Sequence, residues 1–302
     1  MKRGIYIIAN DKVTDHAIAL LNSIRLHDPD TPIIMIPYDE QYHNIANTLN
    51  EYYGVEIYED LDFIDRLSNQ LHDFFGGNFF ARPNQFRKQA CWFGPFEEFL
   101  YIDTDIIVFE KIIDNLNYLT QTDFICCDYQ HVGGIKNVFT PKVLEDKVFN
   151  EDELKDIFNG GFWGSKKNLL SENDLYEIFA ECAAHLEYFD FSEKTSDQPI
   201  INYMLLQRIT QRFNIVRRHG KAPGNWAGTP YFQQQENILV DPTVNQNLQY
   251  LHWAGIRIQP GCPYWEIWDY YRHLNPKLPS AILPKTMKKN ILQKGLDKIM
   301  KF

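Results

Sequence analysis

The sequence predicts an α/β fold in which helices cover a parallel β-sheet. Three short apolar segments, residues 4–9, 32–37 and 55–58, have the length and composition of buried strands. Residues 14–26 and 41–52 lie between them and show the apolar spacing of helices. Because strands that alternate with helices at this spacing pair in parallel, we expect one sheet with helices on its faces.

Further elements continue the pattern along the chain. We expect strands at residues 99–109, 123–127 and 248–252, and helices at 87–92, at 172–187 and from Asp197 onward. Residues 61–82 have a mixed composition that predicts no single element. Residues 217–249 are rich in Asn, Gln, Gly and Pro and have little periodicity, which is typical of loops that build a binding site.

Two acids interrupt the most apolar of these segments. Asp103 and Asp105 stand between the apolar and aromatic residues 99–102 and 106–109. Carboxylates in a buried strand are costly unless a partner compensates them, and a divalent cation would do so. Both can face one ion only if the strand ends at Asp103 and Asp105 lies in the following turn. The alternative is a strand end that faces water, but the apolar flanks favour a metal site.

Composition excludes several classes of function. The chain of 302 residues carries a net charge of −10, which argues against a general nucleic-acid binder. No segment approaches the ~18 uninterrupted apolar residues of a transmembrane helix. The apolar start of the chain is too short for a signal peptide. Five cysteines, an odd number without a Cys-x-x-Cys pair, indicate reduced thiols, so we expect a cytoplasmic protein.

Polar and glycine-rich motifs lie near the expected strand ends. Asn10 and Asp11 follow the first strand, where they could bind a nucleoside or form an ordinary turn. Residues 158–165, with the sequence Phe-Asn-Gly-Gly-Phe-Trp-Gly-Ser, place three glycines among aromatic residues. This motif indicates either a backbone pressed against a ligand or a kinked edge strand.

Four further side chains could complete a site. Lys88 could bind a phosphate, although a lone lysine is more often solvated on a helix face. Asp197 and Gln198 could face the pocket, or Asp197 could only interact with the positive end of a helix dipole. His252 follows a short strand, where a single histidine is usually structural, but two acids that share a metal need a third ligand.

These motifs follow one another in a specific order over about residues 4–260. They are Ala9-Asn10-Asp11, Lys88 in Lys-Gln-Ala-Cys-Trp, Tyr-Ile-Asp103-Thr-Asp105, Phe-Asn159-Gly160-Gly-Phe, Asp197-Gln198 and His252-x-x-Gly255. In this order the chain resembles nucleotide-sugar-dependent glycosyltransferases with a GT-A fold, most of all glycosyltransferase family 8, which includes glycogenin and lipopolysaccharide galactosyltransferases. The resemblance implies a Rossmann-like mixed sheet flanked by helices, in a single large domain with a C-terminal helical extension.

The resemblance also implies roles for individual residues. The metal ion, Mn²⁺ or Mg²⁺, would bind Asp103, Asp105 and His252. The nucleoside of a nucleoside-diphosphate sugar would contact Ala9, Asn10 and Asp11, and the diphosphate would lie near Gly255 and Arg257. The donor sugar would contact Asn159, Gly160 and the catalytic residues Lys88, Asp197 and Gln198. The implied reaction moves a hexose to a hydroxyl of a saccharide or protein with retention of the anomeric configuration.

The chain departs from the family pattern at two positions. Val13 stands where the family often has a tyrosine that stacks on the base, and Ile258 where it has a lysine that binds the diphosphate. Arg257, next to Ile258, could replace that lysine. Two other functions stay open at this stage: a glycoside hydrolase with paired carboxylates, and a non-catalytic protein that binds nucleotide sugars on the same fold.

We expect a catalytic domain at residues 1–260 and an extension at 261–302. Residues 285–302 carry six lysines and one acid among apolar residues, which predicts a basic amphipathic helix. This helix could contact the inner face of a membrane, or it could pack on the domain with its lysines outward. The aromatic residues within 264–268 could stack on an acceptor glycan, but we expect them in the core.

Overall fold

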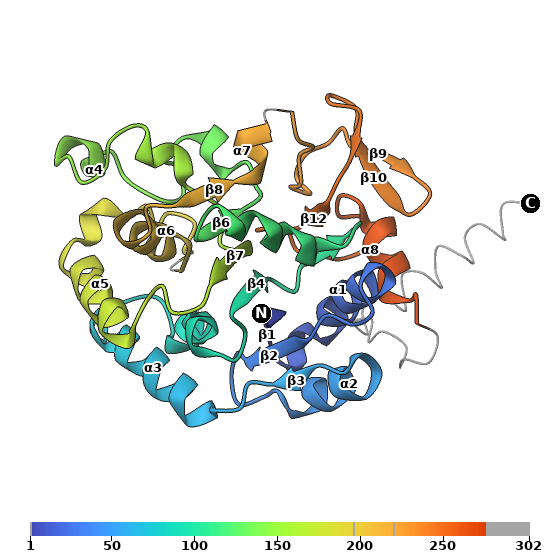
Figure 1. The fold of residues 1–302 in the computed structure, drawn as a ribbon, viewed down its shortest axis with the longest axis horizontal. Coiled ribbons are helices and arrows are strands. Elements are labelled where there is room, and N and C mark those ends of the chain that lie inside the picture. Colours follow the sequence, from blue (N-terminus) through green and yellow to red (C-terminus); the bar gives the residue numbers. More distant parts are fainter. Residues whose placement is uncertain (1, 196, 220, 276–302) are drawn as a thin grey trace, which may run out of the picture.

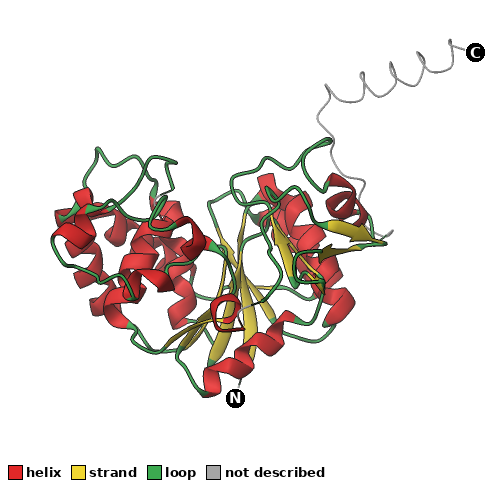
Figure 2. Ribbon diagram, turned by 90° about the horizontal axis from the view of Figure 1, so that it is seen from above, coloured by secondary structure: helices red, strands yellow, loops and turns green. Residues whose placement is uncertain are grey.

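A seven-stranded sheet forms the centre of the protein (Figure 1). The computed structural model describes residues 2–195, 197–219 and 221–275. Helices lie on both sides of the sheet, and Figure 2 shows the strands running away from the N-terminus between two groups of helices. The α/β class predicted from the sequence is therefore confirmed. The predicted basic helix at residues 285–302 lies outside the described residues.

The first part of the chain alternates strands and helices as predicted. Its elements are β1 (Arg3–Ala9), α1 (Thr14–His27), β2 (Ile33–Pro37), α2 (His43–Tyr53), β3 (Glu56–Ile57) and α3 (Leu61–Asp73). The three strands pair in parallel, in the order β3-β2-β1. The sequence pattern did not predict α3, although Asp60 caps it by accepting a hydrogen bond from the Phe63 N–H.

The second part of the chain is less regular. Its strands and α-helices are β4 (Glu98–Ile102), β5 (Ile106–Val108), β6 (Phe124–Cys126), α4 (Lys142–Glu145), β7 (Phe162–Lys166), α5 (Glu172–Ala184), α6 (Asp197–Arg208), β8 (Arg212–Asn214), α7 (Ile215–His219), β9 (Gln233–Gln235), β10 (Ile238–Asp241), β11 (Gln246–Asn247), β12 (Tyr250–His252) and α8 (Trp265–Arg272). Its 3₁₀ helices are Pro83–Phe93, Ile112–Thr120, Gln130–Gly133, Glu153–Asp156 and Leu186–Tyr188, and a short one at Asp11–Val13 precedes α1. The segment predicted as a helix at 87–92 thus belongs to a longer 3₁₀ helix.

The sheet as a whole is mixed, although the strands of the first part of the chain pair in parallel, as their alternation with helices predicts. Its order is β3-β2-β1-β4-β7-β6-β8, and β7 runs antiparallel to both β4 and β6. The alternation predicts parallel pairing only where a helix carries the chain back across the sheet. Between β6 and β7 the chain returns through loops and short helices instead. The mixed sheet implied by the family resemblance is confirmed.

The apolar segment at residues 99–109 does not form one strand. It breaks at the two acids into β4, which pairs in parallel with β1 in the main sheet, and β5, which leaves that sheet. β5 pairs antiparallel with β12, and Ile106 lies opposite His252. This separate two-stranded ribbon brings residues from the end of the chain beside the turn that holds the acids.

The sheet separates two hydrophobic cores. Tyr6, Tyr101 and Trp163 point to one face, whereas Ile5 and Leu100 point to the other, as the alternation of side chains along a strand requires. A third core joins β5, β12 and α8, and Asn22 of α1 donates a hydrogen bond of 2.7 Å to the carbonyl of Tyr271. The aromatic residues near 264–268 therefore contribute to a core, as expected.

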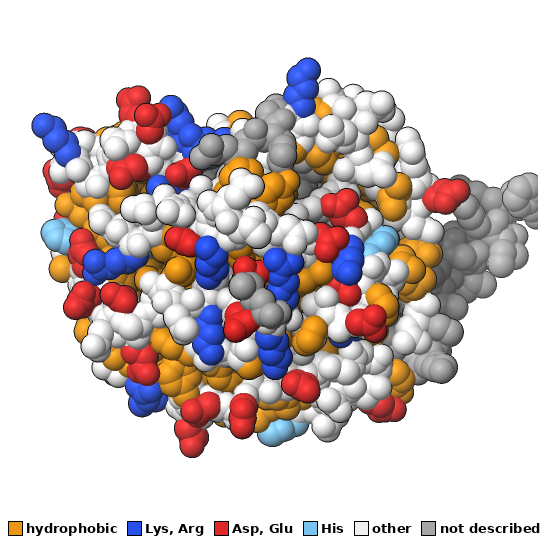
Figure 3. Space-filling model, viewed as in Figure 1, with side chains coloured by type: hydrophobic (Ala, Val, Ile, Leu, Met, Phe, Trp, Pro, Cys, Tyr) orange, Lys and Arg blue, Asp and Glu red, His pale blue; other side chains and the backbone are white. Residues whose placement is uncertain are grey.

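The surface mixes charges of both signs on one face of the molecule. Figure 3 shows Lys and Arg side chains interspersed with Asp and Glu on that face. None of the described helices combines the length and the apolarity needed to cross a membrane. All five cysteines are free.

Gly164 in β7 provides a test of this packing. A Cβ at this position would lie 2.9 Å from Ile125 Cγ1 and from Leu100 Cδ2, so Gly164→Ala should lower the free energy of unfolding by about 1–3 kcal/mol in urea denaturation. Gly77→Ala is the matched control, because its Cβ would have no neighbour within 4 Å, and we expect a change below about 0.5 kcal/mol. Equal stability of the two variants would contradict the packing described here.

Candidate active site

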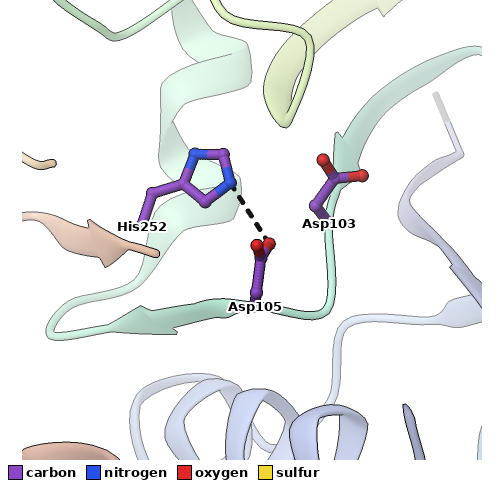
Figure 4. A group of neighbouring side chains, drawn as sticks. All are labelled: Asp103, Asp105 and His252. Carbon is purple, nitrogen blue, oxygen red and sulfur yellow. Dashed lines mark ion pairs between the residues drawn. The ribbon is translucent and has the colours of Figure 1, made fainter. Parts of the chain in front are cut away.

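The turn between β4 and β5 places two carboxylates beside one imidazole (Figure 4). Asp103 follows β4, Asp105 precedes β5, and His252 ends β12. The Nε2 atom of His252 lies 3.2 Å from an Oδ1 of Asp105. One ligand atom from each of the three residues lies within 4.8 Å of the others. The structure thus brings together the three residues expected to hold a metal.

Gly161 leaves room for this group of side chains. A Cβ at this position would lie 2.4 Å from Cε1 of His252 and 2.8 Å from Oδ2 of Asp103. The Gly161 carbonyl also accepts a hydrogen bond of 2.8 Å from the Asp103 N–H. Two carboxylates and one imidazole suit Mn²⁺ or Mg²⁺, with the nitrogen favouring Mn²⁺. The donor atoms, and the space that Gly161 leaves for them, fit a hard divalent cation.

The three side chains differ in exposure. Asp103 and Asp105 keep 31% and 30% of their side-chain surface exposed, whereas His252 keeps 8%. The two carboxylates are therefore accessible from the solvent, whereas the imidazole is buried. An ion at this position would retain coordination sites for ligand oxygens, as a catalytic metal requires.

Burial and mutual charge shift the pKa of each member of the group. Burial raises the pKa of Asp103, and the nearby Asp105 adds to this effect while Lys88 opposes it. Burial also acts to raise the pKa of Asp105, but the charge and hydrogen bond of His252 outweigh it, so that pKa is lowered. Burial acts to lower the pKa of His252, but the Asp105 carboxylate raises it overall. Without a metal, His252 is thus the principal partner of Asp105.

Tyr101, the second-last residue of β4, orients Asp103. Its hydroxyl donates a hydrogen bond of 2.7 Å to Asp103 Oδ1. Its ring stacks on Trp163, with ring centroids 5.3 Å apart, and lies 4.7 Å from the Nζ of Lys88. The stacked rings therefore fix both the Asp103 carboxylate and the Lys88 ammonium group in the site.

Lys88 is buried and lies between two acids. The Pro83–Phe93 helix places its Nζ 2.5 Å from Asp197 Oδ2 and 4.0 Å from Asp103 Oδ1. Burial acts to lower the pKa of Lys88, but Asp197 and Asp103 raise it overall, so the side chain stays protonated. Arg87, the neighbouring cation, is instead paired with Glu40 and Asp65 and is not available to a ligand at this site.

Asn159 and Gln198 form a polar wall beside Gly161. Asn159 donates a hydrogen bond of 3.1 Å to Gln198 Oε1 and accepts one of 3.0 Å from the Gly161 N–H. The backbone of Gln198 lies 3.8 Å from the position that a Cβ on Gly160 would take. The expected sugar-binding residues at 159–160 and 197–198 therefore lie next to one another, although about 40 residues separate them in the sequence.

Asp128 is a buried acid that the sequence analysis missed. Its carboxylate accepts hydrogen bonds from the Gln130 and Asn159 N–H groups, at 2.8 and 3.0 Å. Burial raises the pKa of Asp128 to about 7, with the two hydrogen bonds and His252 opposing the shift. Asp128 directly follows the strand expected at residues 123–127, and an acid at the end of a buried strand is the signal that could have revealed it.

An open cleft of about 570 Å³ adjoins the turn that carries the acids. Its lining residues are Ile8, Ala9, Asn10, Lys12, Val13, Tyr38, Asp39, Phe80, Arg82, Asn84, Gln85 and Thr104. Asn10 donates a hydrogen bond of 2.8 Å to Asp39 Oδ2. Asp11 does not line the cleft, because its carboxylate accepts hydrogen bonds from the Ile45 N–H and the Asn44 side chain at the start of α2. The binding of a nucleoside by Asp11 stays a prediction.

Gly255 and Arg257 lie in the turn after β12. Gly255 has φ +72°, a conformation that favours glycine. Arg257 is exposed, and among the described residues it makes no hydrogen bond or ion pair. Ile258, which stands at the family's lysine position, packs against the third core. The structure therefore does not place Arg257 in contact with the group of acids.

Comparison with known proteins shows the class of this fold. The glycosyltransferase WbbM covers 90% of this chain with a TM-score of 0.61 and 13% identity, and this chain spans 50% of WbbM. The galactosyltransferase LgtC, solved with donor and acceptor sugar analogues, covers 92% with a TM-score of 0.60 and 13% identity, and 98% of LgtC is matched. GlyE of Streptococcus pneumoniae covers 91% with a TM-score of 0.52 and 15% identity, with 61% of its own length matched. The chain therefore has the GT-A fold of glycosyltransferases.

A family model adds a narrower similarity. Residues 2–121 match the family described as "Mannosyltransferase putative". The match spans β1 to β4, the cleft and both acids, but fewer than half of the residues in the chain. No curated protein sequence matches the chain. The predicted resemblance to GT-A glycosyltransferases is confirmed.

Neighbouring glycines allow a matched test of Asp103, Asp105 and His252, the candidate ligands that we call the metal-ligand group. Gly161→Ala should displace the His252 ring, because its Cβ would lie 2.4 Å from Cε1, and it should weaken Mn²⁺ binding at least tenfold in calorimetric titration. Gly160→Ala is the control, since its Cβ would lie no closer than 3.8 Å to any neighbour. Wild-type Mn²⁺ affinity in Gly161→Ala would show that metal binding does not need the space left by Gly161.

The raised pKa of His252 predicts how Mn²⁺ binding depends on pH. A metal binds neutral imidazole, so protons compete with Mn²⁺ below the pKa of His252. Because Asp105 raises that pKa above the ordinary 6.5, affinity should increase as pH rises through values above 6.5 and then level off. Calorimetric titration between pH 5.5 and 9 measures this, with His252→Asn as the comparison. A midpoint below 6.5 would contradict the predicted direction.

Proposed function

We propose that this protein is a metal-dependent glycosyltransferase that moves a hexose from a nucleoside-diphosphate sugar to a hydroxyl of an acceptor, with retention of configuration. The observation that supports the proposal best is the position of the three metal-ligand candidates. Asp103, Asp105 and His252 lie beside a cleft that can hold a nucleotide, because Thr104, which stands between the two acids in sequence, lines that cleft. A diphosphate between the nucleoside and the sugar would then lie against the cation.

The cation would be held by the two carboxylates and the imidazole, with Gly161 leaving space for them. Mn²⁺ is the ion we expect, because one nitrogen ligand accompanies hard oxygen ligands. When bound, it would act as a Lewis acid that stabilises the charge developing on the leaving diphosphate. Tyr101 keeps Asp103 in place by its hydrogen bond, so the ligand geometry is set before substrate arrives.

The cleft has the chemistry that a nucleoside diphosphate requires. Tyr38 and Phe80 supply aromatic surface for the base, and Asn10 and Asp39 supply polar atoms for the ribose or base. Lys12 and Arg82 also line the cleft and carry positive charge. We propose that these two cations provide the charge that the family's lysine would supply at Ile258, because Arg257 is not in contact with the site. Phe80 would likewise supply the aromatic surface that the family's tyrosine offers to the base and that Val13 lacks.

The donor sugar would lie among Lys88, Asp197, Gln198 and Asn159. Lys88 keeps its charge and can stabilise negative charge near the leaving group. Asp197 faces the site through its ion pair with Lys88, and it can stabilise positive charge on the anomeric carbon. Gln198 and Asn159 hydrogen-bond each other, which fixes the polar wall that would bind sugar hydroxyls.

The proposed reaction exchanges one bond at the anomeric carbon for another. The bond from that carbon to the diphosphate oxygen breaks, and the diphosphate leaves with the electron pair. A bond from the acceptor oxygen to the same carbon forms, and the acceptor proton passes to the departing phosphate. We assign no enzyme nucleophile. Retention would follow from attack on the face that the leaving group vacates.

Two alternatives give different experimental results. In a glycoside hydrolase the paired carboxylates stand on either side of the scissile bond, whereas Asp103 and Asp105 share one turn, and an oxygen of each lies within 4.8 Å of the other. Release of sugar from a simple glycoside without a nucleotide would favour the hydrolase. Binding of nucleotide sugars without turnover toward any acceptor or water would favour a non-catalytic protein.

Binding and turnover with nucleotide sugars test the proposal directly. UDP-glucose, UDP-galactose and GDP-mannose should be compared by calorimetry with and without Mn²⁺, followed by donor hydrolysis. We expect at least one of them to bind in a Mn²⁺-dependent manner, and Asp103→Asn and Asp105→Asn each to lower hydrolysis by at least about 10²-fold. Asp152→Asn, at an exposed ion pair with Lys155, is the control. Wild-type hydrolysis in either site variant, or no binding of any donor, would refute the metal-dependent transferase.

A further inference from the structure

A large aromatic side chain is exposed next to the metal-ligand group. Trp226 keeps 50% of its surface exposed. Its backbone forms a parallel bridge with His252: the His252 N–H donates to the Asn225 carbonyl at 2.8 Å, and the Ala227 N–H donates to the His252 carbonyl at 2.9 Å. Side chains of residues paired across neighbouring strands project to the same face. The indole of Trp226 and the imidazole of His252 therefore stand on one face of this bridge.

The indole is held in a fixed orientation although it is exposed. Its Nε1 donates a hydrogen bond of 3.1 Å to the Ala254 carbonyl. A Cβ on Gly228 would lie 2.4 to 2.6 Å from three carbons of the indole six-membered ring, so the ring rests against the Gly228 backbone. An exposed tryptophan that is not needed for packing would be free to rotate. A ring oriented in advance binds a partner without the entropy cost of ordering it.

The loop that carries Trp226 is also anchored. The Asn225 side chain donates a hydrogen bond of 2.6 Å to the Cys127 carbonyl. The Gly224 N–H donates one of 2.9 Å to Asp241 Oδ2 in β10. Together with the bridge to β12, these contacts hold the loop on three sides. The position of the indole relative to the metal-ligand group is therefore set by the fold.

Trp226 lies on the side of the metal-ligand group away from the nucleotide cleft. Asp105 leads into β5, which pairs with one edge of β12, while Trp226 occupies the other edge. The cleft adjoins the group through Thr104, on the side of β1 and β4. A transferred sugar has to lie between its nucleotide and the acceptor, so the acceptor would approach from the side on which Trp226 stands.

We propose that Trp226 is a stacking platform for a sugar ring of the acceptor, which makes the acceptor a saccharide rather than a protein side chain. This inference rests on the proposed transferase function and adds the acceptor class to it. The apolar face of a hexose ring matches an aromatic ring, while its hydroxyls stay hydrated. Tyr231, five residues further along the same loop, is 47% exposed and gives the loop a second exposed aromatic residue.

The test compares acceptor binding with donor binding in the full-length protein. The probes are lactose and the methyl glycosides of galactose, glucose and mannose, measured with Mn²⁺ and the donor found to bind. Saturation-transfer NMR reports contact between glycoside and protein, and transfer kinetics give the acceptor KM. Trp226→Ala should raise the acceptor KM about tenfold or more and remove the NMR signal, while donor affinity in calorimetry stays at the wild-type value.

Three further variants separate stacking from folding. Trp226→Tyr keeps an aromatic ring and should recover part of the acceptor affinity. Gly228→Ala keeps Trp226 but displaces its indole, because the new Cβ would overlap the ring. The acceptor KM of this variant should therefore rise as in Trp226→Ala. Phe74→Ala removes an aromatic ring that is 37% exposed at the end of α3 and should leave transfer unchanged. Thermal unfolding of each variant shows whether a loss reflects the platform or the fold.

The outcomes are distinguishable. The proposal that Trp226 stacks on the acceptor is wrong if the acceptor KM is unchanged in Trp226→Ala. It is also wrong if the acceptor KM rises equally in Phe74→Ala. Mn²⁺-dependent donor binding without contact to any of the four glycosides overturns the saccharide acceptor but leaves the transferase in place. Absence of donor binding overturns the transferase and, with it, the platform. Self-association of the wild-type protein that Trp226→Ala abolishes would show that the indole is a contact between copies of the chain instead.

Discussion

The antiparallel pairing of β5 with β12 is the interaction on which the candidate site depends. It places His252 opposite Ile106 and so within 3.2 Å of Asp105, although about 150 residues separate them. The same segment binds the loop of Trp226 on its other edge. One short strand therefore connects the candidate metal ligands Asp105 and His252 with the loop that carries Trp226. Because Leu251 of β12 is fully buried in the third core together with Ile107 of β5, hydrophobic burial rather than the polar groups of β12 fixes the position of this strand.

The charges of the site are arranged around a position that favours a cation. Asp103, Asp105 and Asp197 contribute negative charge, and Lys88 and His252 compensate part of it. The compensation is specific: Lys88 pairs with Asp197, and His252 with Asp105. Asp103 is left with one tyrosine hydrogen bond and a lysine at 4.0 Å. A divalent cation at this position would relieve the repulsion between the two neighbouring carboxylates.

Much of the fold and part of the site could be predicted from the sequence. Apolar runs located β1, β2 and β4, and the two acids marked the place where β4 ends. Other features could not be read from local pattern. Asp11 follows β1, where a residue that binds a ligand is expected. The structure shows in addition that its carboxylate accepts hydrogen bonds from Asn44 and Ile45 of α2. Lys12 and Arg82 both line the cleft, although about 70 residues separate them in the sequence. Such contacts depend on packing between distant segments.

The sequence by itself determined the class of fold, the order of the first strands and the residue types of the metal-ligand group, because burial periodicity and the cost of buried carboxylates act locally. The tertiary structure alone decided which glycine must lack a side chain, Gly161, since only the approach of β12 brings His252 against it. It also decided that β7 runs antiparallel and that Asp128 is buried beside Asn159. These properties belong to pairs of segments far apart in the chain, and a pattern read along one segment does not contain them.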